Sequence, residues 1–189
     1  MIDDDLSWSK QIDKICKTLG IKIASLKRAR KWGNRDILNH LYHYTIQPVI
    51  DYGITIWSDT TSSTVHKIQR LQNFCARIVL NNFDYKQYRG IDLVKKLKWM
   101  NVKERIDYFL CLTMFKCLNG KAPFYMQNEI SYVNDISERT TTKRAYDIHL
   151  PSFTSNIKEK SVYVRGAKVW NKLPCEIKCI HNIDTFKKK

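Results

Sequence analysis

Apolar residues recur at steps of three and four along most of this chain. The clearest case follows a polar break at residues 58–64, whose Ser, Thr and Asp side chains are good helix caps. Beyond the break, the following apolar positions share one face of a helix with 3.6 residues per turn: Val65, Ile68, Leu71, Cys75, Ile78 and Val79. The pattern predicts a helix that ends near Leu80 and turns this face toward a core.

The opposite face of the same helix carries a narrow basic and amide stripe. It consists of His66, Arg70, Asn73 and Arg77, with Lys67 beside them. One interpretation is that Lys67, Arg70, Asn73 and Arg77 line a nucleic-acid backbone. The other is a solvated face, which the spacing alone favours because amphipathicity needs no ligand to explain it. Arg77 and Asn73 could also brace the bundle.

Further helices are predicted on both sides of this one. Ser7 could cap a helix whose apolar face holds Ile12, Ile15, Leu19, Ile23 and Leu26. Asn34 could cap a short helix at residues 36–47, which Pro48 should end or kink, and residues 49–57 suit either strand or helix.

Later in the chain, residues 91–97 predict a short helix, and Asn101 and Glu104 have capping-box spacing. The helix that follows should bury Val102, Ile106, Phe109, Leu110, Thr113 and Cys117, and should stop at Asn119 and Gly120. Periodicity fades from residue 128 to 156. One more helix, with Val162, Gly166, Val169 and Trp170 on one face, precedes Pro174.

The chain is strongly basic. It has 33 Lys and Arg against 18 Asp and Glu, a formal net charge of +15, and this balance attracts polyanions. We see no apolar run long enough to span a bilayer and no signal peptide, so nucleic acid is the expected polyanion rather than a membrane. The densest cluster is Lys27, Arg28, Arg30 and Lys31, with Arg35 close behind. It suits phosphate contacts and equally suits a solvated helix end.

Metal chemistry has weak support. Cys175 and Cys179 with His181 lack a fourth ligand, and the pair His40 and His43 has no partner motif. The aspartates at residues 3–5 are better explained as charges before a helix N-terminus. We therefore predict no metal, no cofactor and no small-molecule substrate. With no secretory signal, the six cysteines should stay reduced, in the nucleus or cytoplasm.

Several segments together resemble the region that follows the catalytic palm in reverse transcriptases of jockey-like, non-LTR retrotransposons. The family carries P-x-x-D-Y-x-x-x-x-W and then R-L-Q-N-x-x-A-R-x-I, matched here from Pro48 to Trp57 and from Arg70 to Ile78. Its L-x-W-L-x-x-x-x-R, Y-K-x-L-N-G-x-A-P-x-Y-L and G-A-x-x-W-N-x-L-P segments resemble residues 97–105, 115–126 and 166–174. Phe115 replaces the tyrosine and Met126 the last leucine of the second pattern.

The resemblance implies a thumb-like region cut off after the palm. With the faces named above, it predicts an all-α fold: a small helical bundle with a looser C-terminal extension. The expected domains are a bundle at residues 1–127 and a connection segment at 128–189 with a helix near 161–172.

The implied function is to hold a primer–template of RNA, DNA or RNA–DNA hybrid without reading its sequence. The candidate contacts are Lys27, Arg28, Arg30, Lys31, Lys67, Arg70, Asn73 and Arg77. The chain contains no Y-x-D-D sequence and no other catalytic constellation, so we do not expect it to be an enzyme alone. Two alternatives are a structural module that docks onto a polymerase palm, and a relic reading frame without a selected role.

Overall fold

The computed structural model describes residues 8–59, 62–136, 146–150, 152 and 155–188. Their structure is helical and contains no named strand, only an isolated bridge between Tyr132 and Ile148. The all-α prediction is therefore confirmed for this part of the chain. The chain divides into two compact units, Met1–Ile106 and Asp107–Lys189.

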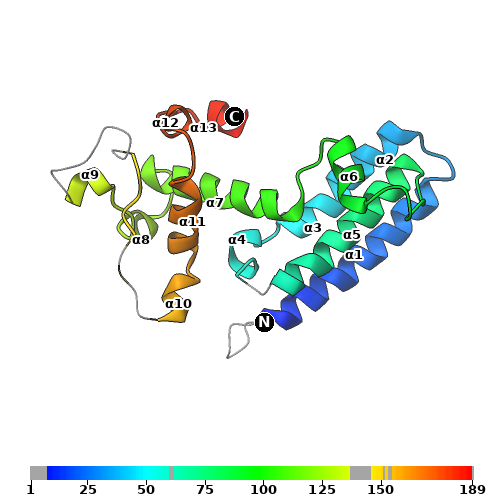
Figure 1. The fold of residues 1–189 in the computed structure, drawn as a ribbon, viewed down its shortest axis with the longest axis horizontal. Coiled ribbons are helices and arrows are strands. Elements are labelled where there is room, and N and C mark those ends of the chain that lie inside the picture. Colours follow the sequence, from blue (N-terminus) through cyan, green and yellow to red (C-terminus); the bar gives the residue numbers. More distant parts are fainter. Residues whose placement is uncertain (1–7, 60–61, 137–145, 151, 153–154, 189) are drawn as a thin grey trace. The chain divides into compact units, whose positions relative to one another are not determined.

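The first unit contains the longer helices of the predicted bundle (Figure 1). They are α1 (Ser9–Ala29), α2 (Arg35–Leu41), the π-helix η1 (Tyr42–Ile46), α3 (Gln47–Asp51), α4 (Ile54–Trp57), α5 (Ser62–Leu80) and α6 (Gly90–Lys96), followed by the start of α7 (Val102–Leu118). Helices α1 and α5 lie side by side and run in the same direction. Every predicted apolar position of α1 is buried, which confirms its core face.

Pro48 neither ends nor sharply breaks its helix. The π-helix η1 precedes it, and the Gln47 N–H donates to the Tyr42 carbonyl five residues earlier. This wider turn places Pro48 in the first turn of α3, where a missing N–H leaves no hydrogen bond unmade. Residues 49–57 are helical apart from a turn at Gly53, whose φ of 64° suits glycine.

Polar side chains cross the core of the first unit, and each has a partner. Gln72 is buried and donates through Nε2 to the Tyr42 hydroxyl and to the Met100 carbonyl, both at 2.9 Å. Burial raises the pKa of Tyr42 above its ordinary value, and the bond from Gln72 offsets part of that rise. Trp99 stacks on Tyr42 at 3.6 Å between ring centroids and donates through Nε1 to Asn39. These contacts fix the register of α2, α5 and the segment before α7.

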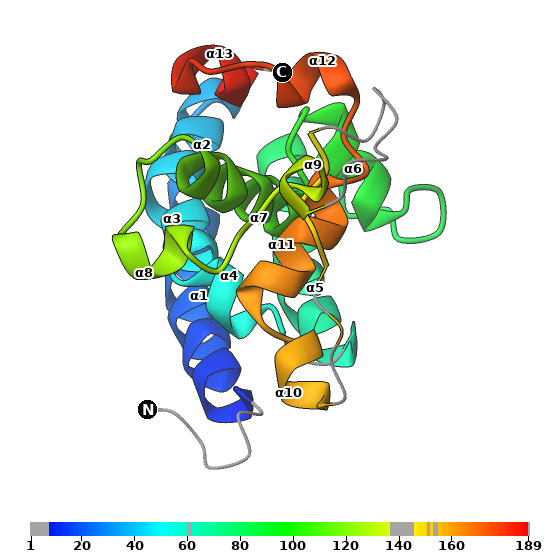
Figure 2. The ribbon, with the colours of Figure 1, turned by 90° about the vertical axis from the view of Figure 1, so that its left-hand side faces the viewer.

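The second unit has a core of its own. Its elements are the remainder of α7, α8 (Phe124–Gln127), α9 (Val133–Ile136), α10 (Asn156–Glu159), α11 (Val162–Trp170), α12 (Cys175–Lys178) and α13 (Ile183–Lys188). Figure 2 shows α11 beside α7, and Gly166 of α11 lies against Met114 of α7. Phe115, Trp170 and Phe186 stack in the centre. The helix expected near residues 161–172 is α11.

The division between the units differs from the one expected at residue 127. It falls inside α7, because residues from Cys111 to Phe115 pack into the Trp170 core rather than into the bundle. Periodicity could not reveal this, since α7 is buried on several sides over that stretch. The second unit is also fastened by polar contacts: Asn171 exchanges two hydrogen bonds with the Ile148 backbone, at 2.8 and 2.9 Å.

Candidate nucleic-acid interface

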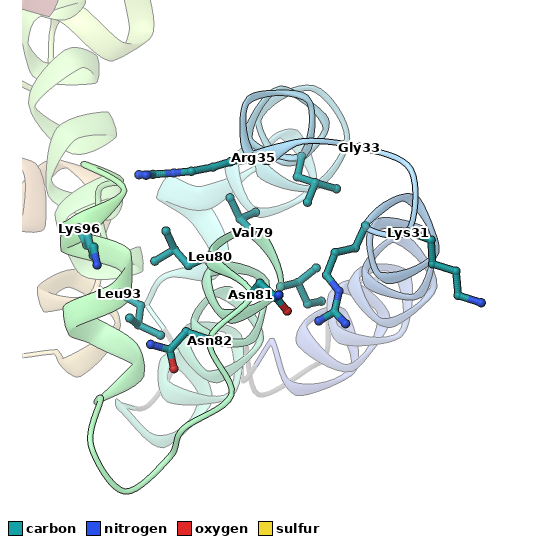
Figure 3. A pocket seen from close by; sticks show the side chains of 12 residues that line it. Lys31, Gly33, Arg35, Val79, Leu80, Asn81, Asn82, Leu93 and Lys96 are labelled. Atoms are coloured by element: carbon teal, nitrogen blue, oxygen red, sulfur yellow. The ribbon is translucent and has the colours of Figure 1, made fainter.

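An open groove of about 630 Å³ lies in the first unit, where α1 and α5 end (Figure 3). We call it the basic groove. It is lined by Arg30, Lys31, Gly33, Arg35, Leu38, Ile78, Val79, Leu80, Asn81, Asn82, Leu93 and Lys96. The apolar members form its floor from three helices, and the polar members come from their ends and the connecting turns. The groove therefore depends on the packing of α1, α2, α5 and α6.

The charged side chains that line the basic groove are all of one sign. Arg30, Lys31, Arg35 and Lys96 line it, and none of its described lining residues is an Asp or Glu. Figure 3 shows Arg35 extending from α2 toward α6, where Lys96 lies, whereas the Lys31 ammonium points away from the groove. Cations gathered over a concave, partly apolar surface focus a positive potential there. Asn81 and Asn82 add amide donors, so the groove can bind phosphate oxygens.

An aromatic contact positions Arg30. Its guanidinium carbon lies 5.0 Å from the centroid of the Phe83 ring, and Phe83 meets Phe74 of α5 edge to face. Stacking of this kind limits the rotamers of the arginine and leaves its N–H groups free to bind an anion. Arg30 is therefore better pre-organised than a lysine on a helix end would be.

The turn between α1 and α2 places the basic cluster at the groove. Asn34 caps α2, as predicted, by accepting from the Ile37 N–H at 3.0 Å. Lys27 and Arg28, one turn earlier on α1, are exposed, and Arg28 donates to Ser25. Of the predicted cluster, Arg30 and Lys31 thus line the groove, whereas Lys27 and Arg28 do not.

The stripe on α5 does not join the basic groove. Lys67 is exposed and forms an ion pair with Asp13 at 3.8 Å, near the start of α1. The groove lies at the other end of both helices, about 18 Å further along α5 at 1.5 Å per residue. Arg70 is exposed between these two points. Lys67 and Arg70 remain predicted contacts for a longer ligand, separate from the groove.

The prediction that Arg77 contacts nucleic acid is wrong. Its side chain is only 5% exposed, and its guanidinium donates to three backbone carbonyls of the following loop: Asn82 at 3.4 Å, Asp84 at 3.2 Å and Tyr88 at 2.7 Å. The Tyr85 ring covers it at 4.0 Å. The helical wheel placed Arg77 opposite the core, but the loop before α6 folds back over that face. Arg77 therefore binds the loop and not a phosphate.

Asn73 also has a structural place. Its Oδ1 accepts from Gln69 at 2.8 Å, and its Cβ lies so close to Gly90 that a Cβ built there would be 2.6 Å away. Gly90 begins α6, so Asn73 marks the point where α6 meets α5. The side chain is half-buried and no phosphate contact is needed to explain it.

Two cationic lining residues of the basic groove were not among the predicted contacts. Arg35 and Lys96 belong to different helices, and only the fold brings them together. Trp32 stands in the middle of the basic cluster and is 91% exposed. A tryptophan within a run of Lys and Arg is itself a sequence signal for nucleic-acid binding.

Metal binding and membrane insertion were the other possibilities to consider for this chain. Among the residues that the structure describes, no group of three His, Cys, Asp or Glu side chains could hold a metal ion. No described helix is long and apolar enough to cross a membrane. The aspartates at residues 3–5 and the proposed cap Ser7 lie outside the described residues.

The residues that carry the family resemblance are mostly those that brace the fold. Asp51 pairs with Arg105, Gln72 bonds Tyr42, Trp170 donates to the Tyr146 carbonyl, and Gly166 lies against Met114. Comparison with protein-family models, curated proteins and solved structures found no match. The resemblance to reverse transcriptases therefore remains a prediction that rests on the motifs.

Proposed function

We propose that the first unit binds the sugar–phosphate backbone of a primer–template nucleic acid through the basic groove, without reading base sequence. The observation that carries this proposal is the gathering of Arg30, Arg35 and Lys96 from three helices around one concave surface whose described lining has no carboxylate. Cationic side chains that only keep a helix face in contact with water need not converge in this way. Phosphates that displace counterions from such a groove gain affinity at low salt.

In this proposal the chain is the thumb and connection region of a non-LTR reverse transcriptase, and the active site lies in a palm outside it. The motif segments support this placement because their residues pair with one another across the bundle, as residues of an inherited fold should. Arg35 and Lys96 would bind phosphates of one strand, and Arg30 would add an anion contact already oriented by Phe83. No base edge needs to be read for any of these contacts.

A salt titration of binding tests the proposal. The ligands are a short RNA–DNA hybrid, duplex DNA of the same length, and heparin as a competitor of similar charge. We expect submicromolar binding to the hybrid that resists heparin, with a log–log salt slope that corresponds to several phosphates at about 0.9 per contact on B-DNA. Equal binding to all three would show that the net charge acts generically, and the proposal would fail.

One observation favours docking onto a polymerase palm as a second candidate. A separate depression of about 400 Å³ lies where α1 meets η1 and α3, and Tyr44 and Tyr52 on its rim are 77% and 79% exposed. Exposed aromatic residues around a depression are typical of protein contacts. This candidate predicts that Tyr44→Ser with Tyr52→Ser weakens binding to a palm domain supplied separately and leaves nucleic-acid binding unchanged.

A further inference from the structure

Trp32 is the most exposed large hydrophobic side chain of the described part of the chain, at 91%. The described tryptophans at positions 57, 99 and 170 are each less than 10% exposed. An indole left in water forgoes the burial that stabilises a folded chain, so an isolated exposed tryptophan calls for an explanation. Its place in the chain, between the groove-lining residues Lys31 and Gly33, supplies one.

The backbone around Trp32 is held in place. The Lys31 N–H donates to the Arg28 carbonyl at 3.2 Å. The N–H groups of Trp32 and Gly33 both donate to the Ala29 carbonyl, at 3.0 and 2.8 Å. A Cβ at Gly33 would lie 3.3 Å from the Ala29 oxygen, so this turn packs closely. Because the backbone is already fixed, a ligand that covers the indole would order little besides the side chain.

Cationic residues precede and follow Trp32 in the chain. Lys31 and Gly33, on either side of it in the sequence, line the basic groove, as do Arg30 and Arg35. An aromatic ring beside cations suits a strand whose phosphates bind the cations while one base covers the ring. The interior bases of a duplex are stacked on one another, so they offer no free face. An unpaired base does.

We infer that Trp32 stacks on an unpaired base of a nucleic acid whose backbone occupies the basic groove. The ligand class is then a duplex with a single-stranded end, or a single strand, rather than a continuous duplex. This inference rests on the proposed function of the groove and adds a preference that the groove alone does not provide.

Binding assays with matched ligands and variants test the inference. The ligands are a blunt RNA–DNA hybrid hairpin, the same hairpin with a short single-stranded overhang, and that hairpin with an abasic overhang of the same charge. The variants are Trp32→Ala, Trp32→Phe, and Tyr52→Ala as a control that removes another highly exposed aromatic ring, one outside the groove. Circular dichroism checks that each variant remains helical.

We expect the wild-type chain to bind the overhang about tenfold more tightly than the blunt or abasic hairpin, the scale of one stacked base. Trp32→Ala should abolish that preference and leave blunt-hairpin affinity and salt slope unchanged. Trp32→Phe and Tyr52→Ala should keep it. Saturation with the overhang hairpin should also quench the emission of Trp32 more strongly than the abasic hairpin does.

The outcomes separate the inference from the proposed function. If Arg35→Gln with Lys96→Gln weakens both hairpins but Trp32→Ala leaves the overhang preference intact, the stacking inference fails and the groove stands. If the groove variant weakens neither hairpin, both fail. Binding to anionic phospholipid vesicles that requires Trp32, without any overhang preference, would also overturn the inference and assign the residue to a membrane surface.

Discussion

Arg105 grips Asp51 at two points, with Nε 2.6 Å from Oδ1 and Nη2 2.5 Å from Oδ2. The two residues lie 54 positions apart and belong to two different motif segments. The Asp51 side chain is 20% exposed and the Arg105 side chain 12%, so solvent screens the pair only in part. This planar, two-point contact joins α3 to the first turns of α7, and a lysine could not reproduce it.

Replacing Asp51 by Asn should therefore destabilise the chain. It leaves the mostly buried Arg105 charge without its counterion, and we expect a loss of about 2–4 kcal/mol in the free energy of unfolding. Arg105→Lys should cost less, about 1–2 kcal/mol, because one charge contact survives. Urea unfolding followed by circular dichroism measures both. A double-mutant cycle with no coupling between the two positions would contradict the pair.

Arg77 should matter for stability and not for binding. Arg77→Met removes the donors to the Asn82, Asp84 and Tyr88 carbonyls, and we expect a loss of about 2–3 kcal/mol. The matched change Arg70→Met, on the exposed side of the same helix, should stay within about 0.5 kcal/mol. Stability comes from urea unfolding, and nucleic-acid affinity is measured on the folded proteins. A stable Arg77→Met protein with a reduced salt slope would restore the original prediction.

Two glycine substitutions should have opposite signs. Gly90→Ala places a Cβ 2.6 Å from that of Asn73, close to the α5 backbone, and overpacking of this kind costs about 1–3 kcal/mol. Gly20→Ala, in the middle of α1 with open space around it, should stabilise by about 0.5–1 kcal/mol. Thermal unfolding of the two variants beside the wild-type chain checks the signs. Equal tolerance at both positions would show that α6 does not meet α5 as described.

The Cys75 thiol predicts how stability falls in alkali. Burial raises its pKa from 9.0 to about 12, so the thiol ionises more easily in the unfolded chain. The contribution of the neutral thiol to the free energy of unfolding is complete below pH 9. It is lost as the pH rises from there toward 12, by up to about 1.4 kcal/mol per pH unit. Urea unfolding at about pH 8 and about pH 10.5 should show a smaller decline for Cys75→Ala than for the wild-type chain. Parallel declines would contradict the burial of this thiol.

Periodicity predicted the helices well because a helix with one buried face carries apolar residues every three to four positions. The buried face of α1 and the Asn101–Glu104 capping box, with bonds of 2.8 and 2.9 Å, follow from local spacing alone. The burial of Gln72 and Arg77 does not, since it depends on which loop or residue covers them. A helical wheel contains the residues of one helix only, so it does not show that the loop at residues 81–89 folds over that helix.

The candidate site was predictable only in its local part. The cluster at Arg30 and Lys31 is visible in the sequence because its charges are consecutive. Lys96 reaches the same groove from a helix more than sixty positions later, and nothing in its own surroundings marks it. The α5 stripe shows the opposite problem, because its residues were predicted to act together and do not all lie on one exposed surface. Residues that share a helix face need not share an exposed surface once neighbouring segments cover part of that face.

The most direct test of the central claim compares two double variants of equal charge. Arg35→Gln with Lys96→Gln removes two cations from the basic groove, and Lys17→Gln with Lys103→Gln removes two exposed cations that do not line it. The measurement is the salt slope of binding to an RNA–DNA hybrid. We predict that the groove variant loses about two phosphate contacts from the slope while the control stays close to wild type. Equal losses in both variants would show that binding follows net charge, and the basic groove would not be the interface.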